Sequence, residues 1–133
     1  MRYLVLIYTP EVDPASVPPE DYQSEMAAYA AFTEECRERG VMRGGEALQP
    51  TSSATTVRVR EGRTIVSDGP FAETKEALGG FYLLECADLD GAIELAAQIP
   101  GAARGSIEVR PIWELPMEYA SQAPAATTAA EAR

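Results

Sequence analysis

The chain has 133 residues, of which 46% are hydrophobic, so it is long and apolar enough to form one domain with its own core. It holds 21 acidic residues against 11 basic ones, and the formal net charge of −10 argues against binding to nucleic acid or to an anionic membrane. There is no histidine. Its absence excludes Ser-His-Asp triads, Cys-His dyads, histidine-ligated metals and histidine general bases.

The two cysteines, Cys36 and Cys86, lie far apart and form no CxxC pair. This predicts a cytoplasmic protein in which both thiols are reduced and buried as small hydrophobic groups. The longest apolar run, Tyr3 to Tyr8, is too short to cross a membrane, and we expect no secretory signal. We also expect no metal and no cofactor, because the chain has no cluster of His or Cys and no calcium-loop signature.

The first predicted element is a strand over residues 2–8 that is apolar on both faces and must therefore be covered on both. A loop rich in proline follows. A helix is then predicted from about Pro19 to Arg39, since proline suits its first turn and Gly40 suits its C-terminal cap. Its apolar side chains recur at spacings of three and four and form one stripe: Tyr22, Met26, Tyr29, Phe32 and Cys36.

Short extended segments follow. Residues 42–48 contain Gly44-Gly45, which weakens a strand but allows a close approach of the backbone. Residues 55–60 and 63–67 flank Glu61-Gly62 and predict a β-hairpin. A strongly apolar strand is predicted over residues 81–86.

A second helix is predicted from Asp88, a good N-cap, to Ile99, with a stripe of Leu89, Ala92, Ile93 and Ala96. The last strand is predicted over residues 106–114, and Pro111 places it at a sheet edge or a bulge because proline cannot donate to a ladder. The domain is expected to cover residues 1–115. Residues 116–133, rich in Ala, Thr and Pro, are expected to form a disordered tail.

This order of elements predicts an α+β fold of the ferredoxin-like, split βαβ type, with one antiparallel sheet and both helices on one face. Two helices on one face leave the other face open, although the strands over residues 3–8 and 81–86 are apolar on both sides. A homodimer that buries the open face is therefore expected.

Residues 68–76, Asp-Gly-Pro-Phe-Ala-Glu-Thr-Lys-Glu, form the densest polar cluster of the chain and include its only lysine. A carboxylate here, Asp68 or Glu73, could act as a general base, with Lys75 or Arg110 holding an anion. The alternative is structural, because Asp-Gly-Pro is typical of turns. In either case Asp68 and Gly69 are expected to fix a tight turn above Phe71, which is predicted to pack into the core.

Basic residues lie mostly on predicted strands and loops: Arg43, Arg58, Arg60, Arg63, Lys75 and Arg110. If several face one cleft, they could hold a small organic anion. The residues predicted to bind such a ligand are Lys75, Arg110 and Tyr82, and those predicted to be catalytic are Asp68 and Glu73.

Residues 68–76, followed by Leu-Gly-Gly-Phe-Tyr-Leu-Leu-Glu over residues 78–85, resemble the signature of the DGPF proteins, a branch of the YCII-related family. The opening strand and residues 105–112 are similar to the same family. The resemblance implies a ferredoxin-like homodimer of the dimeric α+β barrel type. Relatives in the wider family include a dehydrochlorinase-type enzyme of aromatic degradation, in which a His and an Asp are the proposed catalytic pair. Because this chain has no histidine, only the Asp of that pair can have a counterpart here, and the resemblance places it at Asp68.

Three hypotheses therefore stand. The chain is a small cofactor-free enzyme that acts on an organic anion by acid–base chemistry in a dimer cleft; or it is a non-catalytic ligand-binding or regulatory dimer; or it is a structural dimer with a demanding turn. DGPF proteins are often encoded beside extracytoplasmic-function sigma factors, so the resemblance implies such a partner for the second hypothesis.

Overall fold

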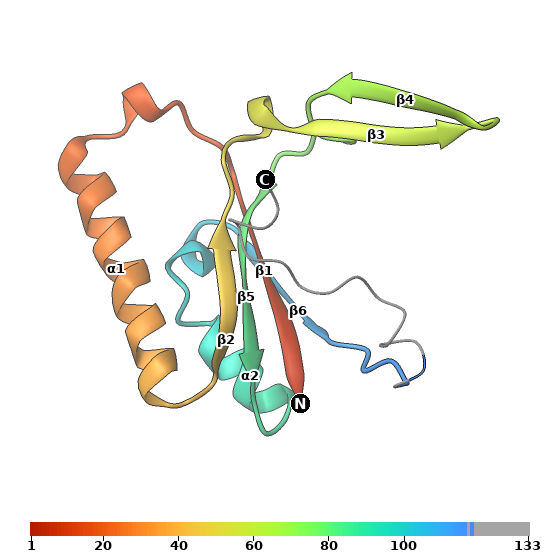
Figure 1. Cartoon of the computed structure of the whole chain (residues 1–133). Helices are drawn as coiled ribbons and strands as arrows, with labels where there is room; N and C mark the ends of the chain where they lie inside the picture. Colours follow the sequence, from red (N-terminus) through yellow and green to blue (C-terminus); the bar gives the residue numbers. More distant parts are fainter. Residues whose placement is uncertain (117, 119–133) are drawn as a thin grey trace, which may run out of the picture.

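The computed structural model describes residues 1–116 and 118, and it shows a four-stranded antiparallel sheet with two helices and a separate hairpin (Figure 1). The elements are β1 (Arg2–Thr9), α1 (Pro19–Glu38), β2 (Met42–Ala47), β3 (Thr55–Arg60), β4 (Arg63–Asp68), β5 (Ala77–Glu85), α2 (Leu89–Ala96) and β6 (Ser106–Pro111). Three short 3-10 helices cover Pro14–Ser16, Thr51–Ser53 and Pro100–Ala103.

The strand order of the main sheet is β2-β5-β1-β6, and all of its pairings are antiparallel. This is the order of a ferredoxin-like fold into which the β3–β4 hairpin has been inserted between the second and third sheet strands. The predicted α+β class and the split βαβ topology are confirmed. The sheet of one chain is open and does not close into a barrel.

The central strand β1 explains why the first segment is apolar on both faces. Tyr3, Val5 and Ile7 are buried on the side of the helices, where they pack in one core cluster with residues of α1 and α2. Leu4 and Leu6 alternate with them and are half-buried on the opposite face, where they pair with Leu83 and Phe81 of β5. We call this second surface the open sheet face.

Helix α2 begins as predicted, because the Asp88 side chain accepts a hydrogen bond of 2.9 Å from the backbone N–H of Gly91. It ends at Ala96, earlier than the predicted Ile99, since Pro100 starts a separate 3-10 helix. Its buried residues are Ala92, Leu95 and Ala96, whereas Leu89 and Ile93 are largely exposed. The predicted stripe was therefore correct for the alanines and wrong for the two large residues.

The last strand lies at a sheet edge, as Pro111 predicted, and pairs only with β1. It ends at Pro111 rather than at residue 114. The tail expected over residues 116–133 falls almost entirely outside the described residues. No helix among the described residues is long and apolar enough to cross a membrane.

The predicted β-hairpin is present, and Glu61 and Gly62 form its turn with positive φ angles of 52° and 73°. After β4, Gly69 adopts a φ of 93°, and its N–H donates to the Ala54 carbonyl over 2.7 Å. The chain thus bends at Gly69, as predicted, but the hydrogen bond there continues the β3–β4 pairing and does not close a tight turn. The prediction for Phe71 is wrong: its side chain is 80% exposed, because the bend leads the chain past the end of the main sheet and away from the core.

Candidate ligand-binding site

A cavity of about 570 Å³ lies between α1, from Glu25 to Arg37, and the strands β2 and β5. Its floor is open because the sheet positions that face α1 there are Gly45, Ala47 and Gly80. Further along the same face, Leu84 is buried in the core, and Met42 borders both the core and the cavity. Gly45 of β2 and Gly80 of β5 therefore leave space beneath the helix that larger side chains would fill.

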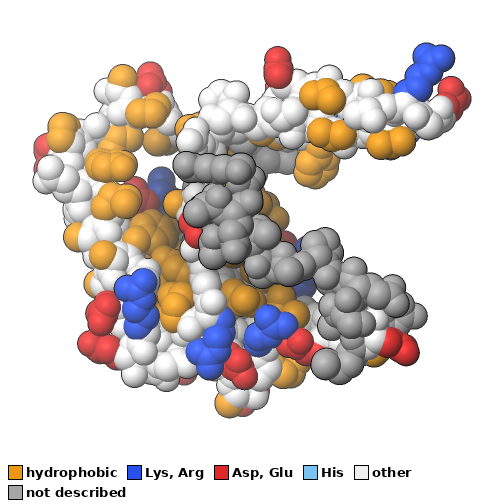
Figure 2. All heavy atoms as spheres, viewed as in Figure 1, with side chains coloured by type: hydrophobic (Ala, Val, Ile, Leu, Met, Phe, Trp, Pro, Cys, Tyr) orange, Lys and Arg blue, Asp and Glu red, His pale blue; other side chains and the backbone are white. Residues whose placement is uncertain are grey.

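The burial of α1 follows the same division. Phe32 and Cys36 of the predicted stripe are buried, whereas Tyr22 and Met26 are more than half exposed. The residues of α1 that line the cavity include Met26, Tyr29, Thr33 and Arg37, spaced by three and four residues along one side of the helix. Figure 2 shows hydrophobic side chains gathered in this hollow beside α1.

Two hydroxyl groups are paired on the cavity wall. The Tyr82 and Thr33 hydroxyls lie 3.2 Å apart, and the Tyr82 ring packs against Phe32 with 5.0 Å between the ring centroids. Because one side of the Tyr82 ring packs against Phe32, a ligand in the cavity can contact Tyr82 only through the free ring face and the hydroxyl. Tyr82, which was predicted to bind a ligand, is thus the one sequence-predicted site residue in the lining.

Tyr29 supplies a third hydroxyl. Burial raises the pKa of Tyr29, and the nearby Glu25 raises it further, while the Gly101 backbone and Arg104 act in the opposite direction. The phenol therefore stays protonated at neutral pH and remains a hydrogen-bond donor. Gly101 allows this arrangement, because a Cβ at that position would lie 2.9 Å from the Tyr29 hydroxyl.

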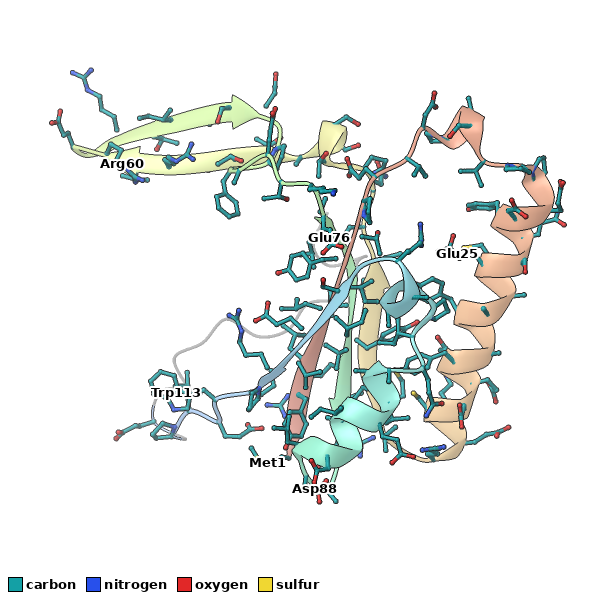
Figure 3. All side chains as sticks on the ribbon, turned by 180° about the vertical axis from the view of Figure 1, so that it is seen from behind. Met1, Glu25, Arg60, Glu76, Asp88 and Trp113 are labelled. Carbon is teal, nitrogen blue, oxygen red and sulfur yellow. The ribbon has the colours of Figure 1, made fainter. Side chains whose placement is uncertain are left out.

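The charged residues of the lining are two arginines and two glutamates: Glu25, Arg37, Glu46 and Arg104. Glu25 points from α1 toward the sheet (Figure 3) and forms an ion pair with Arg104. Arg37 is held less firmly, since its ion pair with Glu34 on the same helix has a long N–O distance of 3.9 Å. Arg37 is thus the cation most available to an incoming anion.

The structure places Asp68 at the end of β4 and Glu73 and Lys75 in the loop before β5, all exposed. Within the described residues none of the three side chains makes a hydrogen bond or an ion pair with another residue. Tyr82 and Arg110 lie on opposite faces of the sheet, because Arg110 pairs with Leu4 on the open sheet face. One chain therefore does not assemble these five residues into a single site.

Arg110 already has a partner on the open sheet face. Its guanidinium Nε donates to the Glu108 carboxylate over 2.8 Å, and this hydrogen bond raises the pKa of Arg110. An anion that bound Arg110 would have to compete with Glu108.

A second cavity, of about 670 Å³, adjoins residues 68–76, which we call the motif segment. It is lined by Tyr8, Leu48, Pro70, Phe71 and Leu78 among others, and no charged side chain contributes to the lining. Asp68, Glu73 and Lys75 lie beside this cavity in sequence but not in its wall. It has the character of an apolar groove rather than a charged site.

The residues that sequence reasoning missed are Glu25, Tyr29, Thr33, Arg37 and Arg104 as a group facing one cavity. A signal for part of the group was present, because positions 26, 29, 33 and 37 share one side of a predicted helix. Gly44-Gly45 also indicated a close approach of the backbone. Arg104 had no such signal, since it reaches Glu25 through tertiary packing.

Residues 1–116 match the family model of the YCII-related domain. A protein of Rhizobium meliloti (strain 1021), described as uncharacterised, is 42% identical over 114 residues, covering 84% of this chain and 92% of the relative. The chain therefore belongs to the YCII-related family. Among solved structures, a 5-chloro-2-hydroxyhydroquinone dehydrochlorinase from Burkholderia phenoliruptrix AC1100, in complex with 2,5-dihydroxybenzoquinone, is similar with a TM-score of 0.47 and 16% sequence identity, covering 89% of this chain and 98% of that one.

Proposed function

We propose that the protein binds a small organic anion with a flat ring in the cavity between α1 and the sheet. The observation that carries this proposal is a cavity of about 570 Å³ whose floor is made of Gly45, Ala47 and Gly80. This volume lies within the range of small-molecule sites, about 300–1,000 Å³. A floor without large side chains accepts a planar group.

The walls offer matching chemistry. The Tyr29 hydroxyl can donate to a ligand oxygen, and the Tyr82 ring provides an apolar surface. Arg37 lies two helical turns beyond Tyr29, and helical side chains lean back toward the N-terminus. Its guanidinium is therefore directed toward the cavity, where it can bind a carboxylate through two parallel hydrogen bonds.

Acid–base catalysis without a cofactor belongs to the same proposal. Glu25 and Tyr29 line the cavity and can accept and donate a proton, respectively. Asp68 and Glu73, which the sequence predicted to be catalytic, stand outside the lining. Their role and that of Lys75 depend on a second copy that would enclose the motif segment in a dimer cleft.

The homodimer is likewise a proposal, supported by the half-buried Leu4, Leu6, Phe81 and Leu83 on the open sheet face. A standard interface would bury on the order of 1,600 Å².

A cytoplasmic location is supported by Cys36 and Cys86, which are buried and not joined in a disulfide. Membership of the DGPF branch rests on the motif over residues 68–76.

A non-catalytic ligand-binding or regulatory dimer, linked to an extracytoplasmic-function sigma factor, is the second candidate. One observation favours it: the ion pair with Arg104 occupies the Glu25 carboxylate and makes it a weaker proton acceptor, and Asp68 and Glu73 form no hydrogen bond or ion pair among the described residues. Consumption of a bound compound would exclude this alternative, whereas binding without turnover would support it.

The test uses 2-hydroxybenzoate as the probe and isothermal titration calorimetry as the readout. Arg37→Gln is expected to weaken binding by roughly tenfold or more, because a charged hydrogen-bonded pair is lost. Arg39→Gln on the same helix is the matched control, since Arg39 pairs with Glu35 and does not line the cavity. Equal affinity of the Arg37→Gln variant and the wild type, or no binding by the wild type to this or any related ring carboxylate, would contradict the proposal.

A further inference from the structure

The β3–β4 hairpin, residues Thr55–Asp68, leaves the end of the main sheet on the side away from α1 (Figure 1). We call it the arm. Its two strands pair only with each other, in a two-stranded sheet of their own. Successive side chains of a strand point to opposite faces, so the arm has two faces of different composition. One face carries its valines, and the other, which we call the arginine face, carries Arg58, Arg60, Arg63 and Ile65.

The arginines of the arm differ from the other arginines in having no ionic partner. The six described arginines outside the arm each form an ion pair with a glutamate: Arg2, Arg37, Arg39, Arg43, Arg104 and Arg110. None of the three arm arginines forms an ion pair with a described residue. Arg60 and Arg63 are exposed, and Arg58 is half-buried. The arm therefore presents positive charge that the described part of the chain does not neutralise.

Two of these arginines lie directly opposite each other. Arg60 of β3 pairs with Arg63 of β4 beside the Glu61-Gly62 turn, and Glu61 forms no ion pair with either of them. Like charges at directly opposite positions destabilise a pair of strands. Figure 2 shows a basic group at the tip of the arm, where Arg60 is labelled in Figure 3. An anionic group bound at the tip would offset this repulsion.

The arginine face also offers apolar surface. Ile65 pairs with Arg58 and lies two residues from Arg63, so it is surrounded by arginines, and it is 46% exposed. Phe71 adjoins the base of the same face, because the Arg58 guanidinium donates to the Phe71 carbonyl over 3.5 Å. Phe71 is 80% exposed. Arginine and aromatic residues are enriched at protein interfaces, so this face suits a partner with both acidic and apolar side chains.

The acidic body of the chain limits the size of such a partner. Because the net charge is −10, a long nucleic acid or an anionic membrane would be repelled by the body while it is attracted by the arm. Strand β3 has six residues and is therefore about 20 Å long. An extended segment of similar length can lie along the arginine face without reaching the body.

We propose that the arginine face of the arm binds a short acidic segment of another protein, in which aspartates or glutamates flank an apolar side chain. The carboxylates pair with the arginines, each of which can donate two parallel hydrogen bonds to a carboxylate. The apolar side chain packs on Ile65. This proposal is independent of ligand binding between α1 and the sheet, since no residue of the arm lines that cavity.

The experiment uses a fluorescein-labelled peptide, Asp-Glu-Asp-Leu-Asp-Glu, and measures its fluorescence anisotropy with the full chain at low ionic strength. Arg60→Gln/Arg63→Gln removes the two charges at the tip of the arm. Arg39→Gln/Arg43→Gln is the matched control, because it changes the net charge by the same amount at arginines that pair with glutamates outside the arm. Circular dichroism checks that all proteins are folded.

The wild type is expected to bind the peptide, and Arg60→Gln/Arg63→Gln is expected to raise the dissociation constant by roughly tenfold, because two ion pairs are lost. The control variant is expected to change it by less than about twofold. Replacing the leucine of the peptide by glycine is expected to weaken binding to the wild type by roughly fivefold. Ile65→Thr should reduce that difference between the two peptides.

Three results would overturn the proposal. The first is a wild type that does not bind the peptide, or two double variants that lose affinity equally. The second is tighter binding of a labelled oligothymidine of the same length, which would indicate a nucleic-acid site. The third is a change in the oligomeric state of Arg60→Gln/Arg63→Gln in sedimentation equilibrium, which would show that the arginine face contacts a second copy.

Discussion

Gly44 and Gly45 are neighbours in β2 but face opposite sides of the sheet, and Gly45 is the one that faces α1. A Cβ at Gly45 would lie 2.8 Å from the Tyr82 ring and 3.0 Å from the Phe81 carbonyl oxygen. A Cβ at Gly44 would meet nothing closer than Leu83 Cβ at 3.9 Å. The two positions therefore form a natural matched pair.

We expect Gly45→Ala to lower the free energy of unfolding by roughly 1–3 kcal/mol, because the Tyr82 ring must shift to admit the methyl group. Gly44→Ala is expected to change it by no more than about 0.5 kcal/mol. Urea unfolding followed by fluorescence measures both values. Equal stability of the two variants would show that the floor of the cavity is more pliant than its packing indicates.

Phe71 and Phe32 show what a residue-level reading of the sequence can and cannot establish. Phe32 was predicted to be buried from helical spacing, and it is. Phe71 was predicted to be buried only because it is a large apolar residue near a turn, and it is exposed. Periodicity indicates which side of an element faces the core, whereas the identity of a single loop residue gives no such indication.

At the scale of elements, local signals were sufficient for the helices, the hairpin and the edge strand. The cavity was not predicted, because the pattern of Tyr22 and Met26 does not differ from that of Phe32 and Cys36. The difference arises from what lies opposite: Gly45, Ala47 and Gly80 leave the cavity open, whereas Leu84 is buried in the core. Such pairing across layers is a tertiary property.

Helix α2 depends on its N-cap, because it is short and Asp88 satisfies one of its first N–H groups. Asp88→Ala is expected to lower the free energy of unfolding by about 1 kcal/mol. Asp88→Asn keeps an oxygen acceptor, so it should retain most of the stability. Thermal unfolding of the two variants measures the difference, and an equal loss in both would point to the charge of Asp88 rather than to its hydrogen bond.

At the scale of the whole molecule, two carboxylates tie distant segments together. Glu11, after β1, accepts hydrogen bonds of 2.8 Å and 2.7 Å from the backbone N–H and hydroxyl of Thr51. Glu114 accepts two hydrogen bonds, each of 2.8 Å, from the Arg2 guanidinium. The bond from the Thr51 backbone lowers the pKa of Glu11, and the Arg2 side chain lowers the pKa of Glu114.

A lowered pKa in the folded state means that the carboxylate form favours folding. Its contribution is present above the ordinary value of 4.5 and is lost as the pH falls through the lower pKa of the folded protein. We therefore expect the midpoint of urea unfolding to fall as the pH drops below 4.5. The double variant Glu11→Gln/Glu114→Gln should be less stable than the wild type at pH 7 and should lose less stability on acidification. If the unfolding midpoints of the variant and the wild type fall in parallel as the pH drops, this assignment is wrong.

The strand order β2-β5-β1-β6 also has a consequence for the order of events during synthesis. The apolar strand β1 leaves the ribosome before both of its partners, since β5 begins only at Ala77 and β6 only at Ser106. At roughly 5–20 residues per second, β1 waits several seconds for its first partner and longer for its second. A nascent chain thus carries an unpaired apolar strand until β5 has emerged, and such a strand is the kind of segment that a ribosome-associated chaperone shields.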